Sequence, residues 1–135
     1  MAVRFNPGLL GSMPPSSFQQ LLFRGSALNF QLTSDQPLTK VYGGSAYTVT
    51  GIFARQRSGG ASVICAGGIY DAAAKGGNAW VAAAQSWVTL ASGVIVPAVV
   101  AITAVVGSAN LILSLTTGST AACTADVYVF GVDMT

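Results

Sequence analysis

The chain has 135 residues, of which 52% are hydrophobic and only 7% are charged. This length corresponds to one domain with a single hydrophobic core, and six scattered basic residues exclude the dense cationic surface that nucleic-acid binding requires. Because the chain has no histidine and its four aspartates lie far apart in sequence, we predict no enzymatic activity, no metal site and no cofactor.

The low charge also bears on how the surface is used. An ordinary soluble domain has about 25% charged residues, and a net charge of +2 provides little repulsion between copies. Charge-poor surfaces are typical of the centres of protein–protein interfaces. The composition therefore predicts that the chain associates with itself and with other proteins.

The first 25 residues differ in composition from the rest. Pro7, Pro14 and Pro15 and two early glycines disfavour regular structure, while residues 16–23 could form one or two helical turns. We predict an extended arm over residues 1–25 that lays its apolar side chains into grooves on neighbouring subunits. The alternative, that it folds back over its own domain, stays open.

Residues 26–135 form the predicted folded domain. Short apolar runs alternate with Gly, Ser, Asn and Asp turns every 8–12 residues, which is typical of an all-β sandwich or barrel. We predict strands at 27–32, 46–55, 61–65, 69–70, 87–90, 94–106 (one or two strands), 111–117 and 124–132, and we leave 79–84 ambiguous. The expected fold is a jelly-roll-like antiparallel β-sandwich of about eight strands.

Residues 91–115 contain no charge and are long enough to cross a bilayer. However, Pro97 lies within the most apolar part, and the turn signal at 107–110 divides the run. Val, Ile and Thr dominate it, and no Lys or Arg flanks it. We therefore predict buried strands joined by a turn, and no membrane partner.

The two cysteines are predicted to be unpaired. The first residues lack the apolar core of a signal peptide, so we expect folding in a reducing cytoplasm. Cys65 and Cys123 have apolar neighbours and are then most simply small buried thiols.

Two further groups of residues could bind a ligand or partner. Arg55 and Arg57 would share one face of a strand, as solvated or interface arginines. A second group consists of aromatic and polar residues that a sugar site could use, although its tryptophans could equally be core anchors: Tyr70, Asp71, Asn78, Trp80 and Trp87.

Three segments within residues 46–133 together form a pattern of strands and turns that is known from a class of proteins: YTVTGIFARQRSGG, AGGIYDAAAKGGNAWVAAAQSW and LILSLTTGSTAACTADVYVFGVDM. This pattern resembles the small jelly-roll decoration, or cement, proteins of tailed-phage heads. The resemblance implies a homotrimer at the capsid surface of the virion, made in the host cytoplasm, which clamps neighbouring major capsid subunits.

From the arm and the arginine pair we predict the partner-binding residues Phe5, Leu9, Leu10, Phe18, Leu22, Phe23, Arg55 and Arg57. Phage tail-fibre and spike domains show a similar Gly/Ala/Thr-rich pattern, so a module that recognises a surface glycan is the alternative function.

Overall fold

The computed structural model describes residues 19–134, which form eight β-strands and no helix. Within this described part there is accordingly no helix long and apolar enough to cross a membrane. The strands are β1 (Gln19–Asn29), β2 (Gln36–Lys40), β3 (Tyr47–Gly59), β4 (Ala66–Ala72), β5 (Gly76–Val81), β6 (Ile95–Ala98), β7 (Leu111–Thr117) and β8 (Cys123–Asp133).

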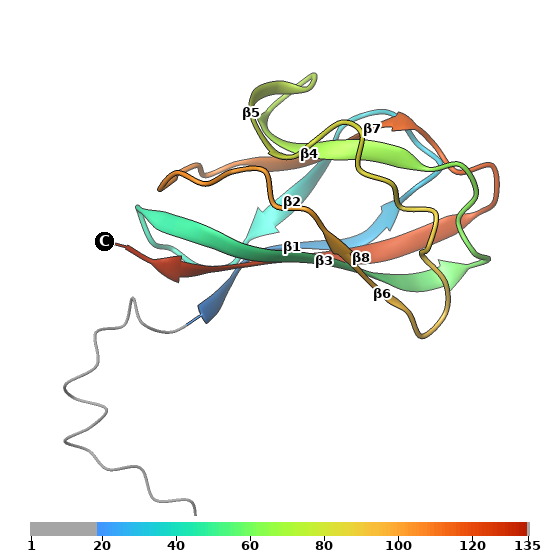
Figure 1. The fold of residues 1–135 in the computed structure, drawn as a ribbon, viewed down its shortest axis with the longest axis horizontal. Coiled ribbons are helices and arrows are strands. Elements are labelled where there is room, and N and C mark those ends of the chain that lie inside the picture. The colour runs from blue at the N-terminus through green and yellow to red at the C-terminus, as the bar shows by residue number, and fades with distance from the viewer. Residues whose placement is uncertain (1–18, 135) are drawn as a thin grey trace, which may run out of the picture.

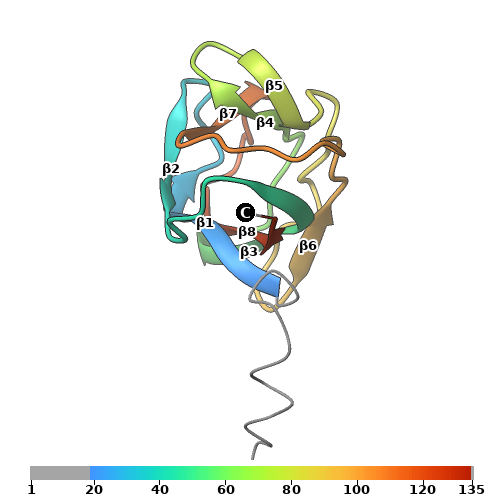
Figure 2. The same ribbon diagram turned by 90° about the vertical axis from the view of Figure 1, so that its left-hand side faces the viewer.

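All eight strands belong to one antiparallel sheet in the order β5-β4-β7-β2-β1-β8-β3-β6. The sheet curls so that β5, β4 and β7 form one layer and β1, β8, β3 and β6 form the other, with β2 at the bend between them (Figures 1 and 2). The predicted all-β, jelly-roll-like sandwich of about eight strands is confirmed.

The long strand β8 organises the second layer, because β1 and β3 pair along its two sides. Its side chains alternate strictly from residue 125 to residue 130. Ala125, Val127 and Val129 are fully buried, whereas Tyr128 and Phe130 lie on the opposite, outer face. The alternation of side chains that predicted this strand therefore also determines which of its residues face the core and which face outward.

Aromatic side chains fill the space between the two layers. The ring of Phe23 lies edge-on to those of Tyr47 and Trp80, with centroids 6.3 and 5.7 Å apart. Phe30 and Trp87 form a second edge-to-face pair, 5.6 Å apart. All five side chains are fully buried, and such pairs add stability beyond the area that they remove from water.

Irregular segments close the open side of the curled sheet, between the edge strands β5 and β6. The amide of Ala101 donates to the carbonyl of Trp80 at 2.8 Å, and Val106 exchanges two hydrogen bonds with Tyr47. The apolar run at 91–115 therefore contains β6, a long connecting segment and the start of β7. Strands at its two ends are confirmed, but the prediction of buried strands joined by a turn is wrong for β6, which is a largely exposed edge strand. Only four residues of the predicted 94–106 stretch form a named strand.

Several predicted boundaries are wrong. Residues 19–25 belong to β1, neither to an arm nor to a helical turn, so the domain boundary at residue 25 falls inside a strand. The predicted strands at 61–65 and 87–90 are loop segments that form backbone hydrogen bonds with each other. The Ser62 amide donates to the Leu90 carbonyl at 3.0 Å, and the Trp87 amide donates to the Cys65 carbonyl at 2.8 Å. Short apolar runs at the ends of a sandwich resemble strands in composition alone.

Candidate functional site

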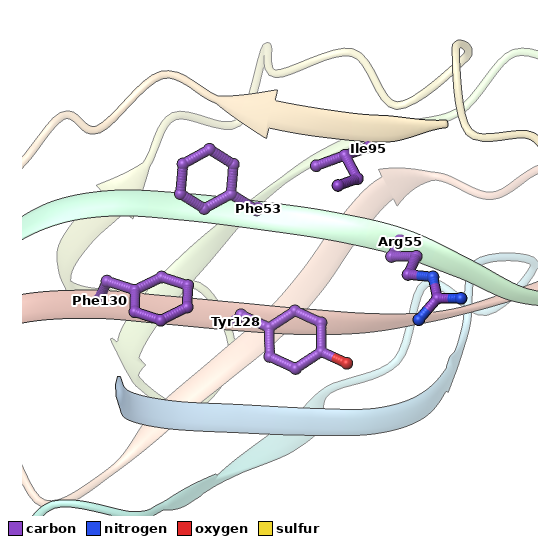
Figure 3. A pocket seen from close by; sticks show the side chains of 5 residues that line it. All are labelled: Phe53, Arg55, Ile95, Tyr128 and Phe130. Carbon is purple, nitrogen blue, oxygen red and sulfur yellow. The ribbon is translucent and has the colours of Figure 1, made fainter. Parts of the chain in front are cut away.

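The outer face of the β1-β8-β3-β6 layer has a partly exposed aromatic surface. A shallow pocket of about 450 Å³ lies there, lined by Phe53 and Arg55 of β3, Ile95 of β6, and Tyr128 and Phe130 of β8 (Figure 3). We call this surface the aromatic face. The solvated face of an antiparallel sheet is ordinarily polar, so apolar side chains gathered there call for an explanation.

Register brings these side chains together. Phe53 lies opposite Tyr128, and Arg55 opposite Ile95 on the other side of β3. The rings of Phe53 and Phe130 meet edge to face, with centroids 6.0 Å apart. Gly51 leaves room for this arrangement, because a Cβ at that position would lie 2.8 Å from the Phe53 ring.

A β-bulge in β3 turns Phe53 outward. Register shifts between Val49 and Gly51, so the alternation of side chains changes phase at that point. Tyr47 points into the core before the bulge, and Ile52 does so after it. A simple period of two would have placed Tyr47 and Phe53 on the same side of the sheet.

Beside the aromatic face, the Asp126 carboxylate, only 8% exposed, is surrounded by donors. It accepts hydrogen bonds from the Ala27 amide at 2.8 Å and from the Arg57 guanidinium at 3.3 Å, and the guanidinium of Arg24 lies 3.8 Å away. Burial alone would raise the pKa of Asp126, but the Ala27 amide and the two arginines together hold it below its usual value.

This carboxylate also fixes the backbone of β1. Ala27 has a φ of 49°, in the left-handed region that residues other than glycine rarely adopt, and it lies in the bulge between Gly25 and Leu28. The hydrogen bond from the Ala27 amide to Asp126 stabilises that conformation. Asp126 therefore links the bulge of β1 to the bulge of β3 that carries Arg57.

Arg55 differs from the other two arginines of this face. Arg24 and Arg57 share Asp126, and the Arg24 guanidinium also lies 5.7 Å from the centre of the Tyr128 ring. Arg55 is exposed, and no carboxylate of residues 19–134 lies within ion-pair distance of it. The face thus combines an apolar pocket with an available guanidinium at its end (Figure 3).

The predicted partner-binding residues have different outcomes. Arg55 borders the pocket, and Arg57 lies beside it in an ion pair. The prediction for Leu22 and Phe23 is wrong, because β1 begins before them and both side chains are 0% exposed in the core. The remaining four predicted residues lie outside the described part of the chain: Phe5, Leu9, Leu10 and Phe18.

The two tryptophans of the suggested sugar site are core residues. Trp87 donates its indole N–H to the Gly67 carbonyl at 3.0 Å, and Trp80 donates to the Asp71 carboxylate at 3.3 Å. Asp71 also accepts from the Asn78 amide. Because both indole side chains are fully buried, they cannot offer a stacking surface to a sugar.

The cysteines and the possible metal ligands make up the remaining candidate chemistry. Residues 19–134 contain no cluster of side chains that could hold a metal ion. Cys65 and Cys123 are free and buried, as predicted, and burial raises the pKa of both thiols, that of Cys65 to about 11. A thiol with a raised pKa is a poor nucleophile at neutral pH.

Comparison with known proteins found no matching family model, no matching curated protein and no matching solved structure.

Proposed function

We propose that this chain is a virion structural protein, a decoration protein that stabilises a capsid lattice through protein–protein contacts and catalyses no reaction. The observation that carries the proposal is the aromatic face, where the half-buried rings of Phe53, Tyr128 and Phe130 line an open pocket on the outer side of the β-sandwich. Large apolar groups in such a position are characteristic of surfaces that are covered in an assembly.

The strand β6 extends this apolar surface to the edge of the sheet. Ile95 is 63% exposed, and its neighbours Val94 and Val99 are exposed as well. β6 ends the order of strands and contains Pro97, which has no N–H to offer a pairing strand. The surface is therefore suited to contact through side chains more than to extension of the sheet.

A separate exposed apolar group lies in the loop before β4. Ile64 has a φ of 47°, in the left-handed region, and its side chain is 65% exposed. A β-branched residue in that region is strained, by about 1–3 kcal/mol. Neighbouring residues hold the loop in place: the Val63 amide donates to the Ser119 hydroxyl at 2.9 Å, and the Trp87 amide donates to the Cys65 carbonyl. A strained, solvent-facing isoleucine is a suitable second contact for a neighbouring subunit.

The resemblance to phage decoration proteins supplies the finer part of the proposal: a major capsid protein as partner, a homotrimer as the assembled form and the capsid surface as the location. A charge-poor surface and two apolar contact regions agree with such an assembly, because a trimer that clamps a lattice contacts both its own copies and the shell.

Binding to particles tests the proposal. Purified chain is mixed with undecorated heads of the virus that encodes it, and bound copies are counted after sedimentation. We expect saturable binding at a fixed number of copies per lattice position, together with heads that resist heat better. Absence of binding, or a gene located outside any viral genome or prophage, would contradict the proposal.

A further inference from the structure

The aromatic face has an excess of positive charge. Arg24, Arg55 and Arg57 project from it, and Asp126 is the carboxylate that lies among them. Two of the arginines already share that carboxylate, and Arg55 remains without an ion pair among the described residues. A partner that covers this face must either leave the Arg55 guanidinium in water or bring an acidic group to it.

A second copy of the chain is poorly suited to supply that group. A two-fold symmetric contact would place this face against itself and oppose arginines with arginines, and in the head-to-tail contacts of a trimer the acidic group would have to be one of the chain's own aspartates. The four aspartates of the chain are each already engaged in their own fold, where they accept at least one hydrogen bond: Asp35 from Ala74, Asp71 from Asn78, Asp126 from Ala27 and Asp133 from Tyr42. Their use by a second copy would therefore compete with an existing contact. The first 18 residues of the sequence contain no Asp or Glu and therefore offer no acidic side chain.

We propose that the aromatic face binds an extended segment of a different protein, in which a bulky apolar side chain enters the pocket and an Asp or Glu pairs with Arg55. The inference rests on the proposed function and names the chemistry of the partner at this face. The pocket of about 450 Å³ is open and its lining is mainly apolar, so one bulky apolar side chain can enter it.

The geometry of β3 fixes the spacing of the two groups in the partner. Phe53 and Arg55 are two residues apart on one face of the strand, which corresponds to about 7 Å. An extended segment that runs along β3 repeats this distance between its own residues i and i+2. The expected motif is therefore an aromatic or aliphatic anchor with a carboxylate two positions away.

Three synthetic octapeptides test the motif in isolation. The first has Phe at position 4 and Asp at position 6 among Ser, Thr and Gly; the second replaces the Asp by Lys, and the third replaces the Phe by Ser. They are titrated into the full ¹⁵N-labelled chain while amide chemical shifts are recorded. We expect the first peptide to shift the amide signals of Phe53, Arg55 and Tyr128. The other two peptides should bind at least about fivefold more weakly.

Two variants locate the effect. Arg55→Gln should make the Asp and Lys peptides bind equally, whereas Lys75→Gln, a matched change at an exposed cation of the β4–β5 turn, should leave the difference intact. Equal binding of the two peptides to the unaltered chain would overturn the inference. So would a lack of shifts on this face at millimolar peptide, or loss of self-association in Phe53→Ser, which would assign the face to a second copy.

Particle binding separates this inference from the proposed function. If heads bind the unaltered chain and Arg55→Gln equally well, the decoration role stands and the inference fails. If the peptides discriminate as expected but the heads bind nothing, the acidic–apolar specificity of the face stands and the decoration role fails.

Discussion

Replacement of Asp126 by Asn tests what the charged cluster beside the aromatic face contributes to stability. The change keeps the shape of the side chain but removes the charge that faces Ala27, Arg57 and Arg24. The side chains of Arg24 and Arg57 are 44% and 52% exposed, so each ion pair contributes only about 0.2–1 kcal/mol. Loss of charge from the hydrogen bond to the Ala27 amide adds about 1 kcal/mol. We therefore expect a loss of about 1–3 kcal/mol in the free energy of unfolding at pH 7.

The dependence of this loss on pH gives a second readout. Because the pKa of Asp126 is lower in the folded protein than in the unfolded chain, its stabilisation is complete above about pH 5 and disappears as the pH falls through the folded-state pKa. Urea denaturation of both proteins should show a difference at pH 7 that narrows toward pH 2. Asp35→Asn, at an exposed aspartate that also accepts a backbone hydrogen bond, is the matched control and should change stability less.

Two results would refute this account of Asp126. One is equal stability of Asp126→Asn and the unaltered chain at pH 7, which would mean that the ion pairs and the Ala27 hydrogen bond contribute nothing. The other is a difference that stays constant down to pH 2, which would assign the effect to altered packing instead of charge. In terms of melting temperature, the expected decrease at pH 7 is about 4 °C for each kcal/mol lost.

Three further predictions concern the rest of the domain. Cys65 and Cys123 should react with a thiol reagent only after denaturant is added, because both are buried with raised pKa values; rapid labelling of the native protein would contradict this. Gly67→Ala should destabilise the fold by more than about 2 kcal/mol in urea denaturation, because a Cβ there would lie 2.3 Å from the backbone of β7, whereas Gly43→Ala, with nothing within 4 Å, should be nearly neutral. Deletion of residues 2–18 should leave the circular dichroism spectrum and, within a few degrees, the melting temperature unchanged, since β1 begins after them; an unfolded product would show that they belong to the core.

The strands β7 and β8 could be predicted from the sequence almost to the residue. In both, apolar residues alternate or run together between clear turn signals, and long-range contacts merely confirm that local pattern. The start of β1 could not be predicted in this way. Leu22 and Phe23 follow prolines and serines that suggest an arm, and only pairing with β8 reveals that they belong to the sheet.

The aromatic face was missed for a specific reason. Phe53 points outward only because a bulge shifts the alternation of β3, and a bulge leaves little trace in one sequence beyond the nearby Gly51. Arg55 could be identified because a charged residue in an apolar strand stands out. Its aromatic neighbours Tyr128 and Phe130 lie about 75 residues further along the chain, and β-sheet register alone brings them beside it.

The proposed function requires that the aromatic face be covered by another protein when the chain binds a particle. Hydroxyl-radical footprinting with mass spectrometry measures this directly, because it reports the solvent exposure of individual side chains. We expect Phe53, Tyr128 and Phe130 to be oxidised in the free chain and protected by at least about fivefold on the particle, with less protection at Leu32, which lies exposed outside this face. Unchanged oxidation of the three aromatic residues in the bound chain would contradict the claim.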